Sequence, residues 1–163
     1  MRRKDKEVTD RQEILDILLR CDTVRIAMHG GDYPYVVPVS FGMETKDDAV
    51  VLYFHCAVTG LKKDLIEQDP RVCVEGDIFI GTELTSPGIT ARYESVIGFG
   101  TCSFVSDPEE IMHGLRLLTE HYGQPDYPLA ECIANCHLLV GKIVLEEITG
   151  KRSLPKGSLN TGV

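Results

Sequence analysis

The feature that most constrains the fold is a series of six apolar, β-branched runs separated by short polar turns. The runs lie at residues 23–28, 35–43, 50–54, 72–80, 95–105 and 138–148. The first two flank His29-Gly30-Gly31-Asp32, a turn signal that predicts a hairpin. Because the runs do not alternate regularly with helices, a doubly wound α/β fold is not expected. We expect instead a mainly β (α+β) chain, a small antiparallel barrel with helices packed outside it.

Four segments have the pattern of flanking helices. The capping-box sequence Thr9–Gln12 begins the first, and Asp107-Pro108, an N-cap acid followed by a proline at the first helical position, begins the third. Both starts are followed by apolar residues at helical spacing. The four helices are expected at residues 10–21, 61–68, 108–122 and 129–135.

Length and charge predict one domain and exclude some partners. A chain of 163 residues is expected to form a single domain over residues 1–150, and residues 151–163 lose apolar content and are expected to be a mobile tail. The net charge of −8 disfavours binding to nucleic acid or to anionic membranes. No stretch has the length of an apolar membrane span, and the N-terminus lacks an apolar leader, so we expect a cytoplasmic protein.

The six cysteines, at positions 21, 56, 73, 102, 132 and 136, are expected to be reduced thiols. Their spacing fits neither a small disulfide framework nor a C-x-x-C motif. Cys132 and Cys136 lie four residues apart, hence on one helical face, and His137 follows, which is the chemistry of metal ligands. No second pair completes such a site, so we expect buried thiols there and no metal.

The sequence YFHCAVTGLKKDLI combines the end of a strand with a cationic helix start. Gly60 permits an unusual backbone conformation, and the free N–H groups that follow it favour an anion. Lys62 and Lys63 are unfavourable at that end of a helix unless a negative ligand is present. The alternative is that both are surface charges paired with Asp64 or Glu67. The residues alone leave phosphate binding and surface pairing equally open.

Two other features of the strands bear on chemistry. His55 and Cys56 could suggest a base and a thiolate, but adjacent strand residues point to opposite faces, so a cysteine hydrolase is a poor explanation. Pro38 cannot donate to a sheet ladder, and it suggests a point where its strand leaves a neighbour.

Five motifs occur in an order that matches a known family. They are YPYVVPVSFG (33–42), LYFHCAVTGLKKDL (52–65), DPRVC (69–73), ARYESVIGFGT (91–101) and ITGK (148–151). Together they resemble the pyridoxamine 5′-phosphate oxidase-like flavin proteins, most closely their nitroimidazole-resistance branch, over about residues 7–152. The resemblance implies a six-stranded antiparallel split β-barrel that binds FMN and pairs as a homodimer, with the flavin in a groove between the subunits.

The resemblance also implies which residues meet the cofactor. The stretch that would run beside the flavin ring is Val37, Pro38, Val39, Ser40 and Phe41. The residues that would handle the flavin and its phosphate are His55, Cys56, Lys62 and Lys63, with His55 on the substrate side as the candidate catalytic residue. Those that would approach from the partner subunit, or else simply pack at a strand start, are Arg92, Tyr93 and Ser95.

Two positions depart from the family pattern. Leu61 stands where the family often has arginine, and Cys56 where a serine or threonine is usual. One charge-assisted phosphate contact is therefore missing unless Lys63 replaces it, and a thiol is a weaker hydrogen-bonding partner than a hydroxyl.

The function implied by the resemblance is reduction of small electrophiles, such as nitroimidazole-type nitroaromatic compounds, with electrons from a reduced nicotinamide. A flavin performs such electron transfer itself, which accords with the lack of a complete acid/base or nucleophile constellation in the sequence. Two alternatives stay open. One is a flavin-binding carrier, sensor or scavenger without turnover, and the other is a haem-binding protein.

Overall fold

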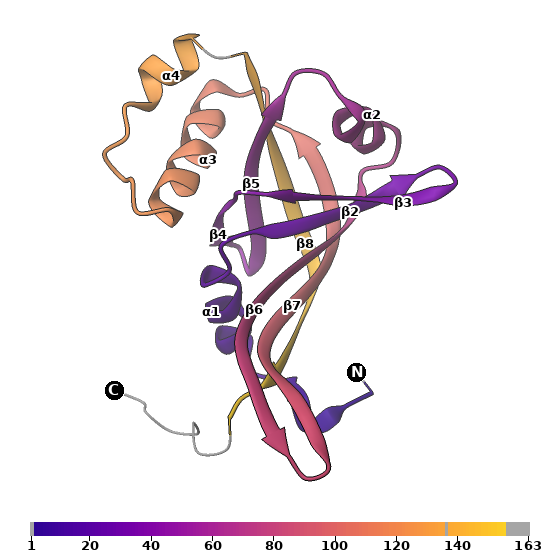
Figure 1. The fold of residues 1–163 in the computed structure, drawn as a ribbon. Helices are drawn as coiled ribbons and strands as arrows, with labels where there is room; N and C mark the ends of the chain where they lie inside the picture. Colours follow the sequence, from indigo (N-terminus) through magenta and orange to yellow (C-terminus); the bar gives the residue numbers. More distant parts are fainter. Residues whose placement is uncertain (1, 136, 156–163) are drawn as a thin grey trace.

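The computed structural model describes residues 2–135 and 137–155, in which one curved antiparallel sheet carries several short helices (Figure 1). The strands are β1 (Glu7–Val8), β2 (Val24–Gly30), β3 (Tyr33–Val39), β4 (Gly42–Lys46), β5 (Ala49–Ala57), β6 (Arg71–Thr85), β7 (Gly88–Phe104) and β8 (Leu138–Ser153). The helices are η1 (Lys4–Lys6), α1 (Arg11–Leu19), α2 (Leu61–Gln68), α3 (Pro108–His121) and α4 (Leu129–Asn135).

The order of the strands explains how the sheet closes into a barrel. The order is β3-β2-β6-β7-β8-β5-β4, and β1 pairs with β8 outside this path. β3 and β4 stand at its two ends, yet only Ser40 and Phe41 separate them in the chain. The sheet must therefore curl until its edges approach each other, which gives a barrel that is split at this crossover.

The prolines of β3 lie where a sheet tolerates them. Pro34 and Pro38 are both on β3, an edge strand of the path, so their missing N–H groups interrupt no central ladder. The pairing of β3 with β2 ends at Val39, opposite Val24. The strand therefore leaves its neighbour after Val39, one residue beyond Pro38, the proline that suggested such a departure.

The structure has eight strands, whereas the sequence predicted six. The run predicted at 35–43 is two strands, because the chain crosses from one edge of the sheet to the other at Ser40-Phe41. The other additional strand is β1, a two-residue strand that pairs with Gly150 and Lys151. An element this short has no periodic signal in the sequence. The mainly antiparallel α+β class is confirmed.

The side chains of β5 alternate between two separate apolar clusters, one on each side of the strand. Leu52 and Phe54 belong to the core inside the barrel, and buried residues of α1 and α2 belong to the same cluster. Val51 and Tyr53 point the other way and are covered by α3 and α4. This alternation is the period of two that a strand imposes, with both of its faces buried.

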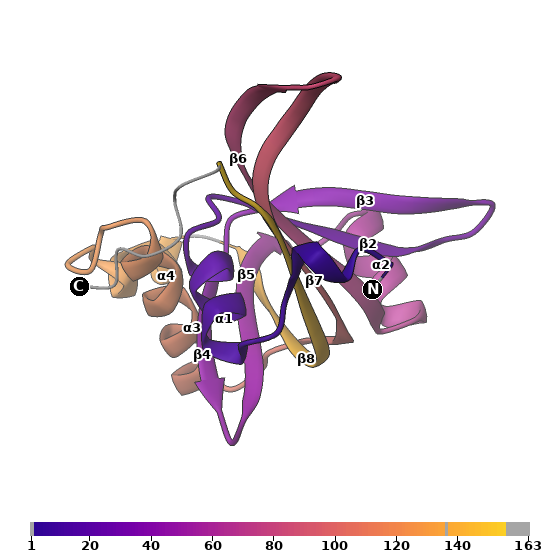
Figure 2. The same cartoon turned by 90° about the horizontal axis from the view of Figure 1, so that it is seen from below.

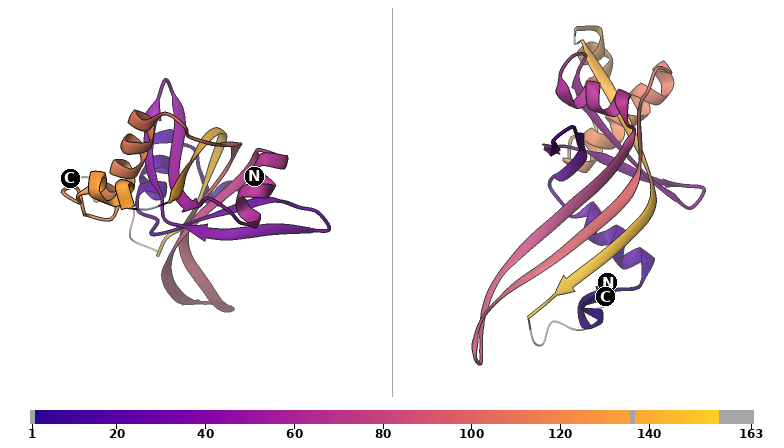
Figure 3. Two further views of the ribbon diagram at one scale, coloured as in Figure 1. Left: turned by 90° about the horizontal axis from the view of Figure 1, so that it is seen from above. Right: turned by 90° about the vertical axis from the view of Figure 1, so that its right-hand side faces the viewer.

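β6 and β7 continue well beyond the barrel as a two-stranded arm, residues 79–93, which stands clear of the helices (Figures 2 and 3). Its ladder runs from Phe79 opposite Tyr93 to Thr85 opposite Gly88, with a register shift after Phe79. The predicted strands ended at Ile80 and began again at Ser95. The sequence prediction therefore missed most of this arm.

The helices begin close to the predicted residues, with one change of cap. The Asp107 side chain accepts from the backbone N–H of Glu110 at 3.0 Å and begins α3 as predicted. At α1 the N-cap is Asp10, which accepts from the backbone N–H of Glu13 at 2.9 Å. The predicted capping box on Thr9 is thus one residue too early.

The C-terminal strand is longer than expected. β8 passes its predicted end at Ile148 and takes in residues 151–153, which were expected to belong to the tail. These residues are held by pairing with β7, with Tyr93 opposite Ser153. The last part of the predicted tail, 156–163, lies outside the described residues, as does Cys136. Within the described part of the chain, no helix combines the length and the apolarity needed to cross a membrane.

Candidate functional site

The start of α2 is an uncapped helix end with two lysines. Gly60 is the N-cap residue, with φ of 134°, a value that favours glycine, and no side chain caps the helix there. The backbone N–H of Asp64 bonds to the carbonyl of Gly60 at 3.2 Å. The N–H groups of the first turn therefore have no side-chain acceptor, and this is a local environment that favours an anion.

The two lysines of this turn have different partners. The Nζ of Lys63 pairs with Glu67 at 2.5 Å, which is the surface pairing that the sequence left open. The Nζ of Lys62 lies 5.1 Å from the centre of the Phe54 ring. Among residues 2–135 and 137–155, no carboxylate lies within ion-pair distance of Lys62. Lys62 is thus the cation that could take an external anion without breaking an existing pair.

Two thiols accompany Lys62 on the inner side of the barrel. Cys56 packs against the inner core and Cys102 belongs to it. Burial raises the pKa of the Cys56 thiol, and the ammonium groups of Lys62 and Lys63 oppose that rise. Burial also raises the pKa of the Cys102 thiol to about 12, again opposed by Lys62. Both groups are therefore protonated thiols near neutral pH, suited to weak hydrogen bonding and not to nucleophilic attack.

His55 lies on the other side of β5. The predicted strand ended at Phe54, but β5 continues to Ala57, with His55 opposite Val140 and Cys56 opposite Leu139. His55 is exposed, and it shares the outward face with Tyr53. A single ligand could meet both His55 and Lys62 only by passing around the end of the strand, so the structure does not bring these two side chains together.

In the stretch from Val37 to Phe41, only the backbone and the two exposed side chains are accessible to a ligand. Val37, Val39 and Phe41 point into the core, whereas Pro38 and Ser40 are exposed. The N–H of Phe41 already donates to the hydroxyl of Tyr122 at 3.3 Å.

The third predicted group lies at the base of the arm. Arg92 pairs with Glu83 at 2.6 Å and donates to the Ser153 hydroxyl at 3.3 Å. Two ammonium groups lie near the centre of the Tyr93 ring, Lys6 at 5.6 Å and Lys151 at 5.4 Å. Ser95 is opposite Lys151 in the ladder.

The base of the arm is far from the lysines of α2. Arg92 and Cys102 are ten residues apart on one strand, about 30 Å at the rise of a β-strand. Cys102 is the β7 residue that interacts with Lys62. Within one chain, therefore, Arg92, Tyr93 and Ser95 do not share a site with Lys62.

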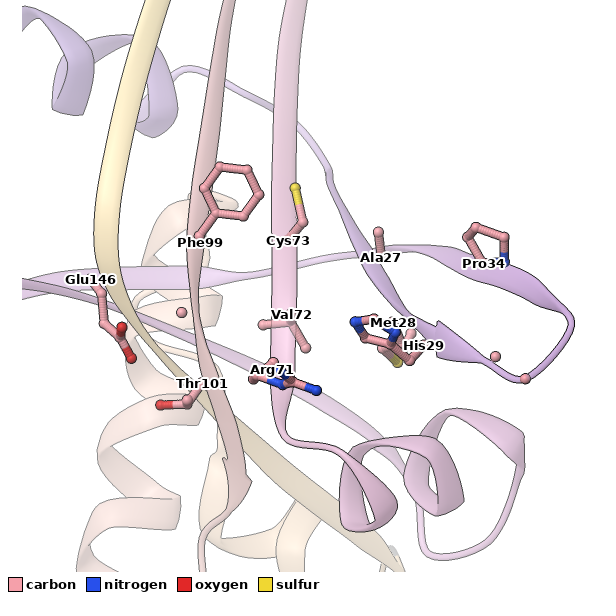
Figure 4. Close-up of a pocket in the computed structure, with 13 residues that line it drawn as sticks. Ala27, Met28, His29, Pro34, Arg71, Val72, Cys73, Phe99, Thr101 and Glu146 are labelled. Carbon is pink, nitrogen blue, oxygen red and sulfur yellow. The ribbon is translucent and has the colours of Figure 1, made fainter.

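Sequence reasoning missed a hollow of about 510 Å³ on the outer side of the sheet. Ala27, Cys73 and Phe99 come from three adjacent strands and line it, with His29 and Arg71 at one end (Figure 4). None of the predicted site residues lines this hollow. A sequence signal near it is Gly98-Phe99-Gly100, where a Cβ on Gly100 would clash with the carbonyl oxygen of Val144, so a glycine in the strand allows this close backbone approach.

Metal chemistry has no support in the described residues. In residues 2–135 and 137–155, no group of three or more His, Cys, Asp or Glu side chains is arranged to hold an ion. Cys136 lies outside these residues, so the interpretation of Cys132 and Cys136 as buried thiols stays a prediction.

Most of the chain matches a known protein family. The family model described as pyridoxamine 5′-phosphate oxidase matches residues 10–152. No curated protein matches the chain at a significant level.

Solved structures resemble the chain over most of its length. A proposed 5-nitroimidazole antibiotic resistance protein from Bacteroides thetaiotaomicron has 28% identity and a TM-score of 0.76, covering 89% of this chain and 85% of that one. A flavocytochrome from Azotobacter vinelandii has 17% identity and a TM-score of 0.77 over 95% and 72%. An FAD and haem binding protein from Mycobacterium smegmatis has 18% identity and a TM-score of 0.76 over 94% and 77%. The family match and the first of these structures together show that the chain belongs to the pyridoxamine 5′-phosphate oxidase-like split-barrel superfamily, in its nitroimidazole-resistance branch.

Proposed function

We propose that this chain is a homodimeric FMN-dependent oxidoreductase that reduces small nitroaromatic electrophiles with electrons from a reduced nicotinamide. The observation that carries the proposal is Lys62, a half-buried cation without an acidic partner in the described chain, at the uncapped start of α2. Membership of the nitroimidazole-resistance branch supports the substrate class. The cytoplasmic location stays a prediction from the sequence.

The residues around α2 fit a phosphate monoester. Lys62 supplies one charge, the first N–H groups of α2 supply donors, and the protonated Cys56 thiol can add a weak one. Lys63 can join only by giving up Glu67. One available cation suits the single phosphate of FMN better than the diphosphate of FAD, which is why we propose FMN.

In this proposal the protein residues bind and orient, and the flavin carries the electrons. Flavin, when bound, accepts two electrons from one donor and returns them to another, so the chain need only position the donor, the acceptor and the cofactor. Lys62 anchors the phosphate, and the exposed Pro38 and Ser40 present the backbone of the crossover. His55, exposed on the outward face of β5, is proposed as the substrate-side residue.

The separation of the predicted residues supports the homodimer. Arg92, Tyr93 and Ser95 lie roughly 23 to 33 Å along β7 from Cys102, the β7 residue near Lys62. These residues can serve the same cofactor only if they come from a second copy of the chain. This separation supports a site shared between two subunits.

Two measurements on the purified protein test the proposal. FMN should bind with the two visible absorption bands of a flavin, and NADH or NADPH should be oxidised when a 5-nitroimidazole is added, one nicotinamide for each two-electron step. A protein that stays colourless after reconstitution with FMN would refute cofactor binding. An FMN complex without nicotinamide oxidation would instead favour the carrier or sensor, and a Soret band would favour haem.

A further inference from the structure

The crossover between β3 and β4, Ser40 and Phe41, lies outside the strand ladders of the described residues. The pairing of β3 ends at Val39, and that of β4 begins at Gly42. The backbone groups between these two positions therefore need other partners. Phe41 is fully buried, so its N–H would cost stability if it had no acceptor.

The acceptor comes from Tyr122, the residue that directly follows α3. Its hydroxyl accepts from the backbone N–H of Phe41 at 3.3 Å and donates its proton to the carbonyl of Asp22 at 2.7 Å. A hydroxyl has one proton and two lone pairs, so both bonds form at once. Asp22 belongs to the turn between α1 and β2. One oxygen atom thus joins the crossover to the end of α3 and to this turn.

The neighbouring His121 contacts the same two segments. Its Nε2 lies 3.0 Å from the carbonyl oxygen of Cys21, and because a carbonyl only accepts, this nitrogen carries the proton. The centre of its ring lies 4.4 Å from that of the Phe41 ring. His121 and Tyr122 therefore hold both the ring and the backbone of Phe41, and we call their contacts the α3 clamp.

The end of α3 is a fixed support for this clamp. The backbone N–H of Gly123 bonds to the carbonyl of Glu120 at 3.0 Å and ends the helix directly after Tyr122. On the β4 side of the crossover, a Cβ on Gly42 would clash with the backbone of Leu118, so helix and strand are in direct contact there. The position of the crossover is thus set by α3, which packs beside β4 and β5 (Figure 1).

The clamp also sets the direction of a second backbone group. The N–H of Phe41 and the carbonyl of Ser40 belong to one planar trans peptide unit, in which they point in opposite directions. The Ser40 carbonyl therefore points away from Tyr122. Ser40 is exposed, and its carbonyl has no hydrogen-bond partner among residues 2–135 and 137–155. It is an acceptor with a fixed direction that is free to take an N–H from a ligand.

We propose that Tyr122 is a positioning residue, which with His121 aims the Ser40 carbonyl at the N–H of the flavin ring. Neither residue of the clamp touches the flavin, since both act through Phe41. For its ligand the inference rests on the proposed function, whereas the clamp itself is present in the chain without ligand. Because Lys62 and the start of α2 hold the phosphate, the clamp should govern binding of the ring and not of the phosphate.

The first test is hydrogen exchange of the ligand-free protein, because Tyr122→Phe removes only the hydroxyl. The exchange rate of the Phe41 amide, relative to that of Ile26 in the β2 ladder, should rise about five- to tenfold, the factor of one hydrogen bond. Tyr33→Phe is the matched control, since Tyr33 is 80% exposed at the hairpin between β2 and β3. A ratio that stays at the wild-type value in Tyr122→Phe would overturn the clamp.

The second test compares FMN with riboflavin, which has the same ring and no phosphate. Tyr122→Phe should raise both dissociation constants by the same factor, about three- to tenfold, whereas Lys62→Ala should raise that of FMN alone. If both flavins bind Tyr122→Phe as tightly as wild type, the crossover does not meet the ring and the positioning role is wrong. A wild type that binds neither flavin refutes the proposed function and the positioning role together, and the exchange ratio then decides the clamp alone.

Discussion

At the scale of single residues, the phosphate proposal depends on the difference between two neighbouring lysines. Lys62 has no acidic partner in the described chain, whereas Lys63 pairs with Glu67 at 2.5 Å. Lys62→Ala should therefore weaken FMN binding by roughly 1.5–3 kcal/mol, the range for a hydrogen bond to a charged group. Lys63→Ala should have the smaller effect. Titration of FMN fluorescence measures both, with the exposed Lys46→Ala as control.

A gain of affinity is expected at the position where the chain departs from its family. Leu61 is exposed at the first position of α2, so a longer polar side chain meets no steric barrier there. Leu61→Arg should tighten FMN binding by at least tenfold, because arginine adds the charge-assisted contact that the family often has. Leu61→Gln, of similar length without the charge, is the control. Equal affinities for the two variants would place the phosphate elsewhere.

At the scale of elements, α3 is attached to the barrel through a polar cluster as well as through apolar packing. The Tyr53 hydroxyl lies 3.2 Å from a carboxylate oxygen of Glu44 and 3.2 Å from one of Glu110, so its single proton can be donated to either. Lys142 donates to Glu110 at 2.6 Å. His113 lies 2.9 Å from the other oxygen of Glu44. These contacts join α3 to β4, β5 and β8.

This cluster predicts a pH dependence of stability. The hydrogen bond from Lys142 is the main reason that the pKa of Glu110 lies below its ordinary value of 4.5. A lowered folded pKa means that the stabilisation is fully present above the unfolded pKa and is lost as the pH falls through the folded pKa. Glu110→Gln should therefore lower the free energy of unfolding at pH 7, and the difference from wild type should shrink below pH 4.5.

Urea unfolding between pH 3 and pH 7 measures this difference. Glu109→Gln removes the same charge from the neighbouring, exposed position of α3, outside the contacts with Lys142, and is the matched control at each pH. A difference for Glu110→Gln that is constant with pH would refute the role of the ion pair.

Some elements could be predicted from short sequence patterns, and others could not. Asp107-Pro108 fixes the start of α3 because cap and helix lie in one short stretch. β5 continues through His55 because this residue pairs with Val140, which is distant in the sequence. A local sequence pattern therefore could not predict the continuation. The arm was missed because its inner face is polar, with Glu83 and Arg92 paired across the two strands. The hollow needs Ala27, Cys73 and Phe99 together, which only the sheet order provides.

At the scale of the whole molecule, one buried carboxylate joins three distant segments. Glu94, on β7 at the base of the arm, is only 5% exposed. It accepts from Arg20, just after α1, at 2.6 Å and from Arg152, near the end of β8, at 2.7 Å. A buried carboxylate requires such partners, since an unpaired one would shift its pKa and become neutral. Glu94 thereby fixes the direction in which the arm leaves the barrel.

Glu94→Gln should lower the free energy of unfolding by about 2–3 kcal/mol, because two charge-assisted hydrogen bonds are replaced by weaker ones. The loss stays below that of a fully buried pair because Arg20 is half exposed and can turn to water. Asp5→Asn, which breaks an exposed pair with Arg3, should cause no measurable change. If both variants unfold at the same urea concentration, Glu94 does not hold these segments together. If Glu94→Gln is destabilised and Asp5→Asn is not, the buried carboxylate holds the three segments together.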